Sequence, residues 1–253
     1  MIQFDYPLNE RMRIFLRLES LFIRLHRLVH STDRDCIQAA VMDIISVLHI
    51  FSCRVDLKAE LIKELERHQA LLKKYLGSPE ADEDTLERLL KSIRPLLETL
   101  HQSDAGLGQN LREDEFIKSI MQRSGIPGGT CNFDLPIYHR WLCEPIDRCQ
   151  KNLVSWCNEF ATASEAILLI MDIIRNSVLP QEKIAEKGFM LLTLDRSKPF
   201  QMLHLKVDKS LAIFPEISGN RHRCVIRFMD FSAEHRPQQT KRDVPFLLTC
   251  CQL

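Results

Sequence analysis

The chain has 253 residues, of which 34 are basic, 34 are acidic, 45% are hydrophobic and only 8 are glycine. This length allows one large domain or two small ones, each with a hydrophobic core of its own. The neutral net charge argues against a protein that coats nucleic acid, because such proteins normally carry a basic excess. The apolar content excludes a disordered chain, and the few glycines exclude a collagen-like one.

Residues 8–178 have the three- and four-residue spacing of apolar side chains that is typical of amphipathic helices. Asn9 is the expected N-cap of the first helix, and Gly77 marks the end of the third. The last helical stretch is long, and we expect a break in it between Asn158 and Ser164. The predicted helices span residues 11–29, 34–51, 57–76, 83–100, 112–123 and 145–177.

Beyond Pro180 the apolar residues occur in short, partly alternating segments separated by polar turns, which predicts strands at residues 189–194, 202–207, 224–229 and 244–249. Ile2, Phe4 and Tyr6 also alternate, so residues 1–7 are a candidate strand of the same sheet. We therefore predict an α+β fold. Its large N-terminal α-helical domain spans residues 8–182, and its smaller C-terminal antiparallel β domain spans residues 183–253, with strand 1–7 as a candidate addition.

The overall neutrality hides a charge difference between these two parts. From Lys183 to Leu253 there are 12 basic and 7 acidic residues, a net charge of +5, so the remainder of the chain carries −5. A basic part of this kind attracts an acidic partner more than it stabilises a fold.

One arc of the first predicted helix is basic, since Arg13, Arg17, Arg24 and Arg27 fall close together at 100° per residue, whereas Arg11 falls outside this arc. No acidic residue lies within the arc, and like charges at this spacing repel one another. The arc is either a solvated face or a binding face, and we expect an acidic group, from the same chain or from a ligand, to compensate it.

The predicted strand at 224–229 has a second basic face. Period two places Arg223, Val225, Arg227 and Met229 on one side, and Arg221 lies in the preceding turn. Basic side chains mixed with apolar ones suit a peptide groove. A surface strand that carries charges against aggregation would show the same pattern, so both interpretations stand.

No catalytic motif is present, since the glycine-rich segments lack the dinucleotide and phosphate-loop fingerprints and there is no H-E-x-x-H or G-x-S-x-G. Cys143, Cys149 and Cys157 with His139 match no common zinc spacing, and none of the nine cysteines forms a C-x-x-C pair. We expect no enzyme, cofactor or metal. Without an uninterrupted apolar run of about 18 residues or a secretory signal, we expect a cytoplasmic protein with reduced thiols and no membrane insertion.

Several segments resemble the cell division protein ZapD family (Z-ring-associated protein D), in order along nearly the whole chain. They are YPLNERMRIFLRLE (6–19), LIKELER (61–67), LRED (111–114), IPGG (126–129), FDLP (133–136), HRWL (139–142), FPEISG (214–219) and VIRFM (225–229). Because these motifs are long and unusual, the resemblance is specific.

The resemblance implies a cytoplasmic bacterial homodimer, at midcell with the division ring, that binds the C-terminal tail of the tubulin-like protein FtsZ. A basic pocket near the meeting of the two domains would hold the tail, and the dimer would cross-link and bundle FtsZ filaments to support Z-ring assembly. The residues that the resemblance assigns to tail binding are Arg17, Arg112, His139, Arg223 and Arg227. Arg13, Arg24 and Arg221, from the two basic faces described above, are candidate supporting residues. Here Glu115 follows the LRED segment, where the family can carry a basic residue, so less positive charge is expected at that point.

Each exposed charge pair contributes only about 0.2–1 kcal/mol, so we expect several arginines and an apolar contact to act together. A dimer that holds one tail raises the effective concentration of its second site, which can improve avidity by roughly 10²–10⁴-fold. A nucleic-acid binder is the first alternative, and the neutral net charge disfavours it. An enzyme is the second, and no motif supports it.

Overall fold

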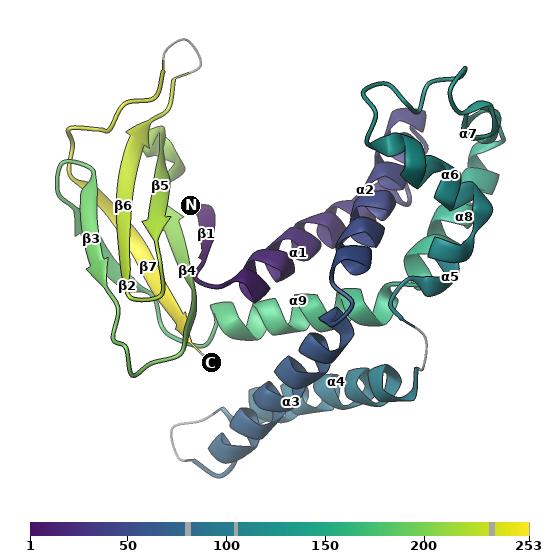
Figure 1. Ribbon diagram of the computed structural model, residues 1–253. Helices are drawn as coiled ribbons and strands as arrows, with labels where there is room; N and C mark the ends of the chain where they lie inside the picture. Colours follow the sequence, from purple (N-terminus) through teal and green to yellow (C-terminus); the bar gives the residue numbers. More distant parts are fainter. Residues whose placement is uncertain (79–81, 104–105, 233–235, 253) are drawn as a thin grey trace. The chain divides into compact units, whose positions relative to one another are not determined.

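The computed structural model describes residues 1–78, 82–103, 106–232 and 236–252 (Figure 1). The chain forms two compact units: one joins Met1–Leu16 to Met171–Leu253, and the other is Arg17–Ile170. We call the first the β unit and the second the helical unit. The predicted α+β fold is confirmed, with a helical N-terminal region, a C-terminal antiparallel β region and a strand at the N-terminus. The domain bounds 8–182 and 183–253 stay a prediction.

The helices follow the apolar periodicity closely. They are α1 (Glu10–Leu28), α2 (Arg34–Cys53), α3 (Leu57–Tyr75), α4 (Glu83–Gln102), α5 (Gln109–Glu113), α6 (Glu115–Ser124), α7 (Pro136–Leu142), α8 (Ile146–Asn158) and α9 (Ala161–Arg175). The Asn9 carboxamide oxygen accepts a hydrogen bond from the Met12 N–H at 2.9 Å, so the expected cap of α1 is present. The expected break in the last stretch lies between α8 and α9.

Two helical details differ from the expectation. The helix predicted at 112–123 is divided into α5 and α6, because Asp114 is extended and its carboxylate caps α6 by accepting the Ile117 N–H at 2.9 Å. The short helix α7 was not predicted, since its seven residues span too few turns to show a periodicity.

The core of the helical unit is built around α2, whose buried residues include Ile37, Ile44 and Leu48. Among the described residues, α2 is the one helix that is long and apolar enough to cross a membrane by length and composition. Half of its apolar stretch is buried inside the protein, and Asp43 interrupts it. A core helix of a water-soluble domain has the same properties, so α2 is weak support for a membrane span.

The β unit contains two antiparallel sheets, one in the order β1-β4-β7-β2 and one in the order β3-β6-β5. The strands are β1 (Ile2–Pro7), β2 (Gln181–Ala185), β3 (Phe189–Thr193), β4 (Phe200–Val207), β5 (Ile213–Gly219), β6 (Arg223–Asp230) and β7 (Val244–Gln252), with a 3₁₀ turn at Lys209–Leu211. Figure 1 shows the strand at the N-terminus, β1, beside β4. The candidate strand 1–7 is thus a strand of the first sheet.

The inner faces of both sheets share one apolar core, in which the rings of Phe228 on β6 and Phe246 on β7 lie 5.0 Å apart. A largely buried ion pair connects β1, α9 and β4 in this unit. The Asp5 carboxylate on β1 accepts hydrogen bonds from Arg175 at the end of α9 and from His204 on β4. The first seven residues of α1 and the last five of α9 also belong to the β unit, together with the strands.

Candidate peptide-binding surface

The outer face of the three-stranded sheet presents two of the predicted arginines side by side along β6. Arg223 and Arg227 are exposed, whereas Cys224, Ile226 and Phe228 between and beyond them are buried in the core. This is the period-two arrangement that the sequence predicts. Neither arginine forms an ion pair with any other described residue, so both guanidinium groups are open to a ligand.

The neighbouring strands complete this surface with apolar side chains. Phe189 of β3 is opposite Arg227, and Leu191 is opposite Val225; these two β3 side chains are 42% and 43% exposed. On the other side, Glu216 of β5 is opposite Arg227. We call the set Phe189, Leu191, Thr193, Glu216, Ser218, Arg223, Val225 and Arg227 the β6 face. It combines exposed apolar side chains with cations, as a groove for an acidic peptide requires.

The third arginine of this region, Arg221, lies in the turn from β5 to β6. The Asn220 carboxamide oxygen accepts the N–H groups of His222 at 2.9 Å and Arg223 at 3.2 Å. The Arg221 Nε donates to His222 Nε2 at 3.2 Å. The turn is therefore tightly bonded, and it fixes the point at which Arg223 enters the strand.

The arginines of α1 differ in their surroundings. Arg13 donates to the Glu10 carboxylate at 3.1 Å, and Arg24 pairs with the buried Asp43 of α2. Because the Arg24 guanidinium donates hydrogen bonds to the Asp43 carboxylate, its pKa is raised. Arg17 is exposed and has no ion pair among the described residues. The acidic compensation expected for this arc is thus partly supplied by the chain itself, whereas Arg17 and Arg27 form no ion pair among the described residues.

Arg112 of α5 lines a small cavity of about 130 Å³ in the helical unit, together with Arg54 and Lys58. Arg54 is held by Glu60 at 2.9 Å, and Lys58 donates to the Ser103 carbonyl. Arg54 and Lys58 are not conspicuous in the sequence, because the connection between α2 and α3 that brings them beside Arg112 leaves no periodic signal. His139 of α7 is exposed and lies outside this cavity.

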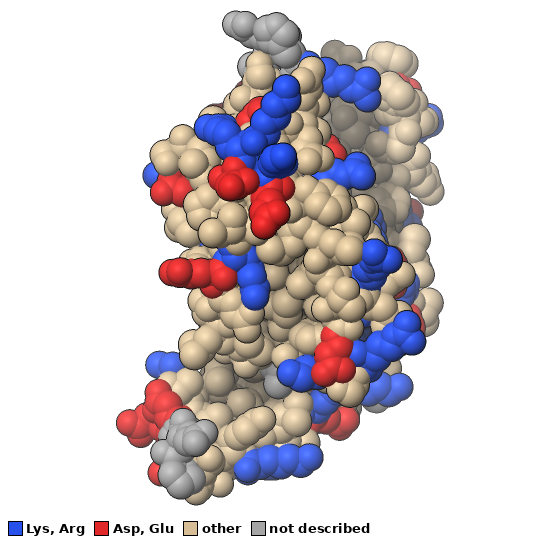
Figure 2. Space-filling view, turned by 90° about the vertical axis from the view of Figure 1, so that its left-hand side faces the viewer, with Lys and Arg blue, Asp and Glu red and all other residues tan. Residues whose placement is uncertain are grey.

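Of the predicted site residues, the structure brings together Arg223 and Arg227, with Arg221 in the turn beside them. Arg17, Arg24, Arg112 and His139 belong to the helical unit and lie on three different helices. The β unit as a whole carries 15 basic and 11 acidic residues. Figure 2 shows basic side chains next to acidic ones at several points, with wide uncharged areas between them. On the face that Figure 2 shows, the charge is therefore distributed rather than gathered in one continuous patch.

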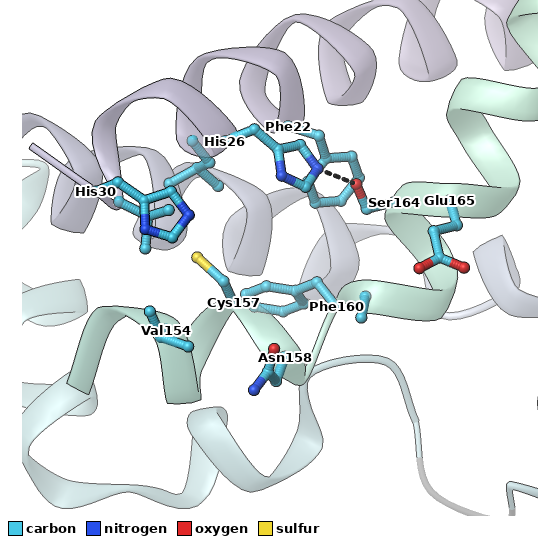
Figure 3. Close-up of a pocket in the computed structure, with 12 residues that line it drawn as sticks. Phe22, His26, His30, Val154, Cys157, Asn158, Phe160, Ser164 and Glu165 are labelled. Carbon is cyan, nitrogen blue, oxygen red and sulfur yellow. Dashed lines mark hydrogen bonds between the residues drawn. The ribbon is translucent and has the colours of Figure 1, made fainter. Parts of the chain in front are cut away.

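The helical unit also contains an apolar pocket of about 170 Å³ between α1, α8 and α9. Figure 3 shows His26 and Ser164 facing one another, with their Nε2 and Oγ atoms 3.4 Å apart. Burial raises the pKa of the Cys157 thiol in this pocket to about 11, so that cysteine stays protonated and a poor nucleophile at neutral pH. Within the described ranges no group of three or more His, Cys, Asp or Glu side chains could hold a metal ion.

We expect Arg24→Ala to lower the free energy of unfolding by about 1–2 kcal/mol, because it leaves the buried Asp43 carboxylate without its cation. The loss is smaller than for a fully buried pair, since the Arg24 side chain is 60% exposed. Chemical denaturation measures this, with Arg17→Ala as a matched control on the same helix. Adding Asp43→Asn to Arg24→Ala should recover part of the lost stability. Equal losses for Arg24→Ala and Arg17→Ala would show that the Arg24–Asp43 ion pair does not stabilise the protein.

The chain is similar along its length to known proteins. The family model of ZapD, a cell division protein, matches residues 16–227. A cell division protein ZapD from Methylococcus capsulatus is 37% identical over 255 residues, which cover 100% of this chain and 98% of that relative. The ZapD of Chromobacterium violaceum is 36% identical, over 100% of this chain and 100% of that relative. The ZapD of Aromatoleum aromaticum is 34% identical, over 100% of this chain and 98% of that relative. The similarity therefore extends over both units.

Proposed function

The chain belongs to the ZapD family of cell division proteins, and from this premise we propose that it binds the C-terminal tail of FtsZ and bundles FtsZ filaments. In this proposal it acts as a cytoplasmic homodimer at midcell, and the cross-links support assembly of the Z-ring. It is not an enzyme, needs no cofactor, and neither binds nucleic acid nor inserts into a membrane.

The observation that carries the proposal is the β6 face. Arg223 and Arg227 supply positive charge and form no ion pair among the described residues, although Glu216 lies opposite Arg227, and Phe189 and Leu191 supply exposed apolar surface beside them. Large exposed apolar side chains rimmed by charges mark interaction surfaces. An extended acidic peptide with apolar side chains fits such a face, because its carboxylates and its apolar groups both find partners.

Arg17, Arg112 and His139 are the remaining proposed contacts to the tail, with Arg13, Arg24 and Arg221 in support. Because exposed ion pairs contribute only about 0.2–1 kcal/mol each, one site of this kind binds weakly. A homodimer offers two such sites to a filament that presents one tail per subunit. Effective concentration can then raise the avidity by roughly 10²–10⁴-fold, which makes weak sites sufficient for bundling.

Sedimentation of polymerised FtsZ tests this proposal. We expect the protein to pellet with full-length FtsZ filaments, and to stay in the supernatant with tail-deleted FtsZ. Arg223→Ala/Arg227→Ala should weaken co-sedimentation by about 10-fold or more, since both charge-assisted contacts are lost. Higher salt should weaken it further, because exposed charge interactions are screened.

The matched control is Arg88→Ala/Arg94→Ala, which removes two exposed arginines from α4. It should pellet like the unchanged protein. Bundling that survives the β6 substitutions would place the tail site elsewhere, and the absence of co-sedimentation with full-length FtsZ at moderate salt would refute the proposed function. Analytical ultracentrifugation of the protein alone tests the homodimer separately.

A further inference from the structure

A second basic feature of the β unit lies outside the β6 face. It is a cavity of about 620 Å³ formed by three segments: the first turn of α1, the connection between β3 and β4, and the turn between β5 and β6. Small-molecule sites typically occupy about 300–1,000 Å³. All of the lining residues belong to the β unit, so the cavity is complete within one compact body.

Its charge is strongly one-sided. Arg11, Arg196, Lys198 and Arg221 line it, and the described lining contains no acidic side chain. Arg196, Lys198 and Arg221 form no ion pair with any described residue. The nearest acid in sequence, Asp195, directs one carboxylate oxygen to the Ser197 N–H at 2.9 Å and to the Ser197 hydroxyl at 2.7 Å. Arg196, Lys198 and Arg221 in one concavity repel one another, and a bound anion would relieve this repulsion.

Two of the cations are held in place by neighbouring polar groups. The Gln201 side chain is buried, and its Oε1 accepts hydrogen bonds from Arg11 Nη2 at 3.1 Å and from Asn9 Nδ2 at 3.0 Å. Gln201 Nε2 in turn donates to the Pro199 carbonyl at 3.2 Å. On the opposite turn, Arg221 Nε donates to His222. Guanidinium groups fixed in this way lose less conformational entropy when a ligand binds.

The chemistry of the lining identifies the kind of anion. Arginine forks match the paired oxygens of phosphate and carboxylate groups, and Arg196, Lys198 and Arg221 together balance more charge than one phosphate carries. The volume also exceeds that of a single phosphate, and Phe200 contributes an apolar wall. We propose that this cavity binds a small anion with at least two linked phosphate groups.

Isothermal titration calorimetry with ATP, inorganic tripolyphosphate and AMP tests the proposal on the full chain. ATP and tripolyphosphate should bind, and AMP should bind at least about 10-fold more weakly, because it offers one phosphate to several cations. Tighter binding of ATP than of tripolyphosphate would identify a nucleotide as the source, through contact with the Phe200 wall. Equal binding would identify inorganic polyphosphate.

Arg196→Ala/Arg221→Ala should weaken ATP and tripolyphosphate binding by about 10-fold or more, since two charge-assisted contacts are lost. The matched control is Arg223→Ala/Arg227→Ala, which removes the same charge from the same unit outside the cavity, and it should change binding by less than about 3-fold. Both exposed pairs should leave the thermal unfolding temperature unchanged. The proposal would be overturned if the two variants weakened binding equally, or if neither ATP nor tripolyphosphate bound at millimolar concentration. It would also be overturned if the FtsZ tail peptide bound in this cavity.

Discussion

Asp5→Asn is expected to lower the free energy of unfolding by about 3 kcal/mol, because it removes the anion from a largely buried ion pair. The Asp5 carboxylate accepts hydrogen bonds from Arg175 Nη2 at 2.7 Å and from His204 Nδ1 at 2.6 Å. The side chains of Asp5, Arg175 and His204 are 20%, 23% and 5% exposed. Removing one partner of a buried pair costs about 3–5 kcal/mol, and the partial exposure of Asp5 favours the lower end.

This contribution should depend on pH in a defined direction. Burial alone would raise the pKa of Asp5, but the hydrogen bonds from His204 and Arg175 outweigh it, so the folded pKa lies below 3.8. The unfolded chain therefore binds the Asp5 proton first as the pH falls. The stabilisation is fully present above the unfolded pKa and is lost as the pH falls through the lower folded pKa.

Urea denaturation of both proteins at pH 7 and at pH 3 measures this effect. The difference between the unchanged protein and Asp5→Asn should be large at pH 7 and smaller at pH 3. Glu182→Gln is the matched control, since Glu182 is exposed on β2 and loses the same charge; it should change stability by less than about 0.5 kcal/mol. If Asp5→Asn were as mild as this control, the ion pair would not stabilise the β unit.

Local patterns predict the elements well where a segment is long or strictly alternating. The period-two spacing of Arg223 and Arg227 predicts their common exposed face, and the alternation at Ile2, Phe4 and Tyr6 predicts β1. The strand β5 was not predicted, because it contains Pro215, and a proline has no N–H group to donate within a sheet. A proline is tolerated there since β5 lies at the edge of its sheet. β2 was also not predicted, because its five residues are too short and polar to alternate clearly.

Contacts between distant segments leave no local signal. Asp5 lies 170 positions before Arg175 and 199 before His204, and only the pairing of β1 with β4 brings them together. The cavity lined by Arg11, Arg196 and Arg221 has the same origin. Arg11 falls outside the basic arc of α1, and Arg196 is one basic residue in an ordinary turn, so neither is conspicuous in the sequence. Their common cavity depends on how three turns of the β unit meet.

Gly219→Ala should lower the free energy of unfolding by about 3 kcal/mol, because Gly219 has a backbone conformation that other residues rarely adopt. Its φ is +146°, and an added Cβ would lie 2.3 Å from the Arg223 carbonyl oxygen, which is backbone and cannot move away alone. The Gly219 carbonyl also accepts the Tyr6 hydroxyl of β1 at 3.2 Å, so a shift of this turn would disturb a bond between the two sheets.

The matched control for this change is Gly128→Ala, because Gly128 also has a positive φ, of +72°, but an added Cβ would have no atom within 4 Å. That control should lose only about 1 kcal/mol, the cost of the left-handed backbone by itself. Thermal and urea denaturation of both variants compare the two losses. Since the turn after Gly219 carries Arg221 and leads into Arg223, Gly219→Ala should also weaken FtsZ co-sedimentation and tripolyphosphate binding together. Equal, small losses at Gly219 and Gly128 would show that the turn is not held as tightly as its contacts indicate.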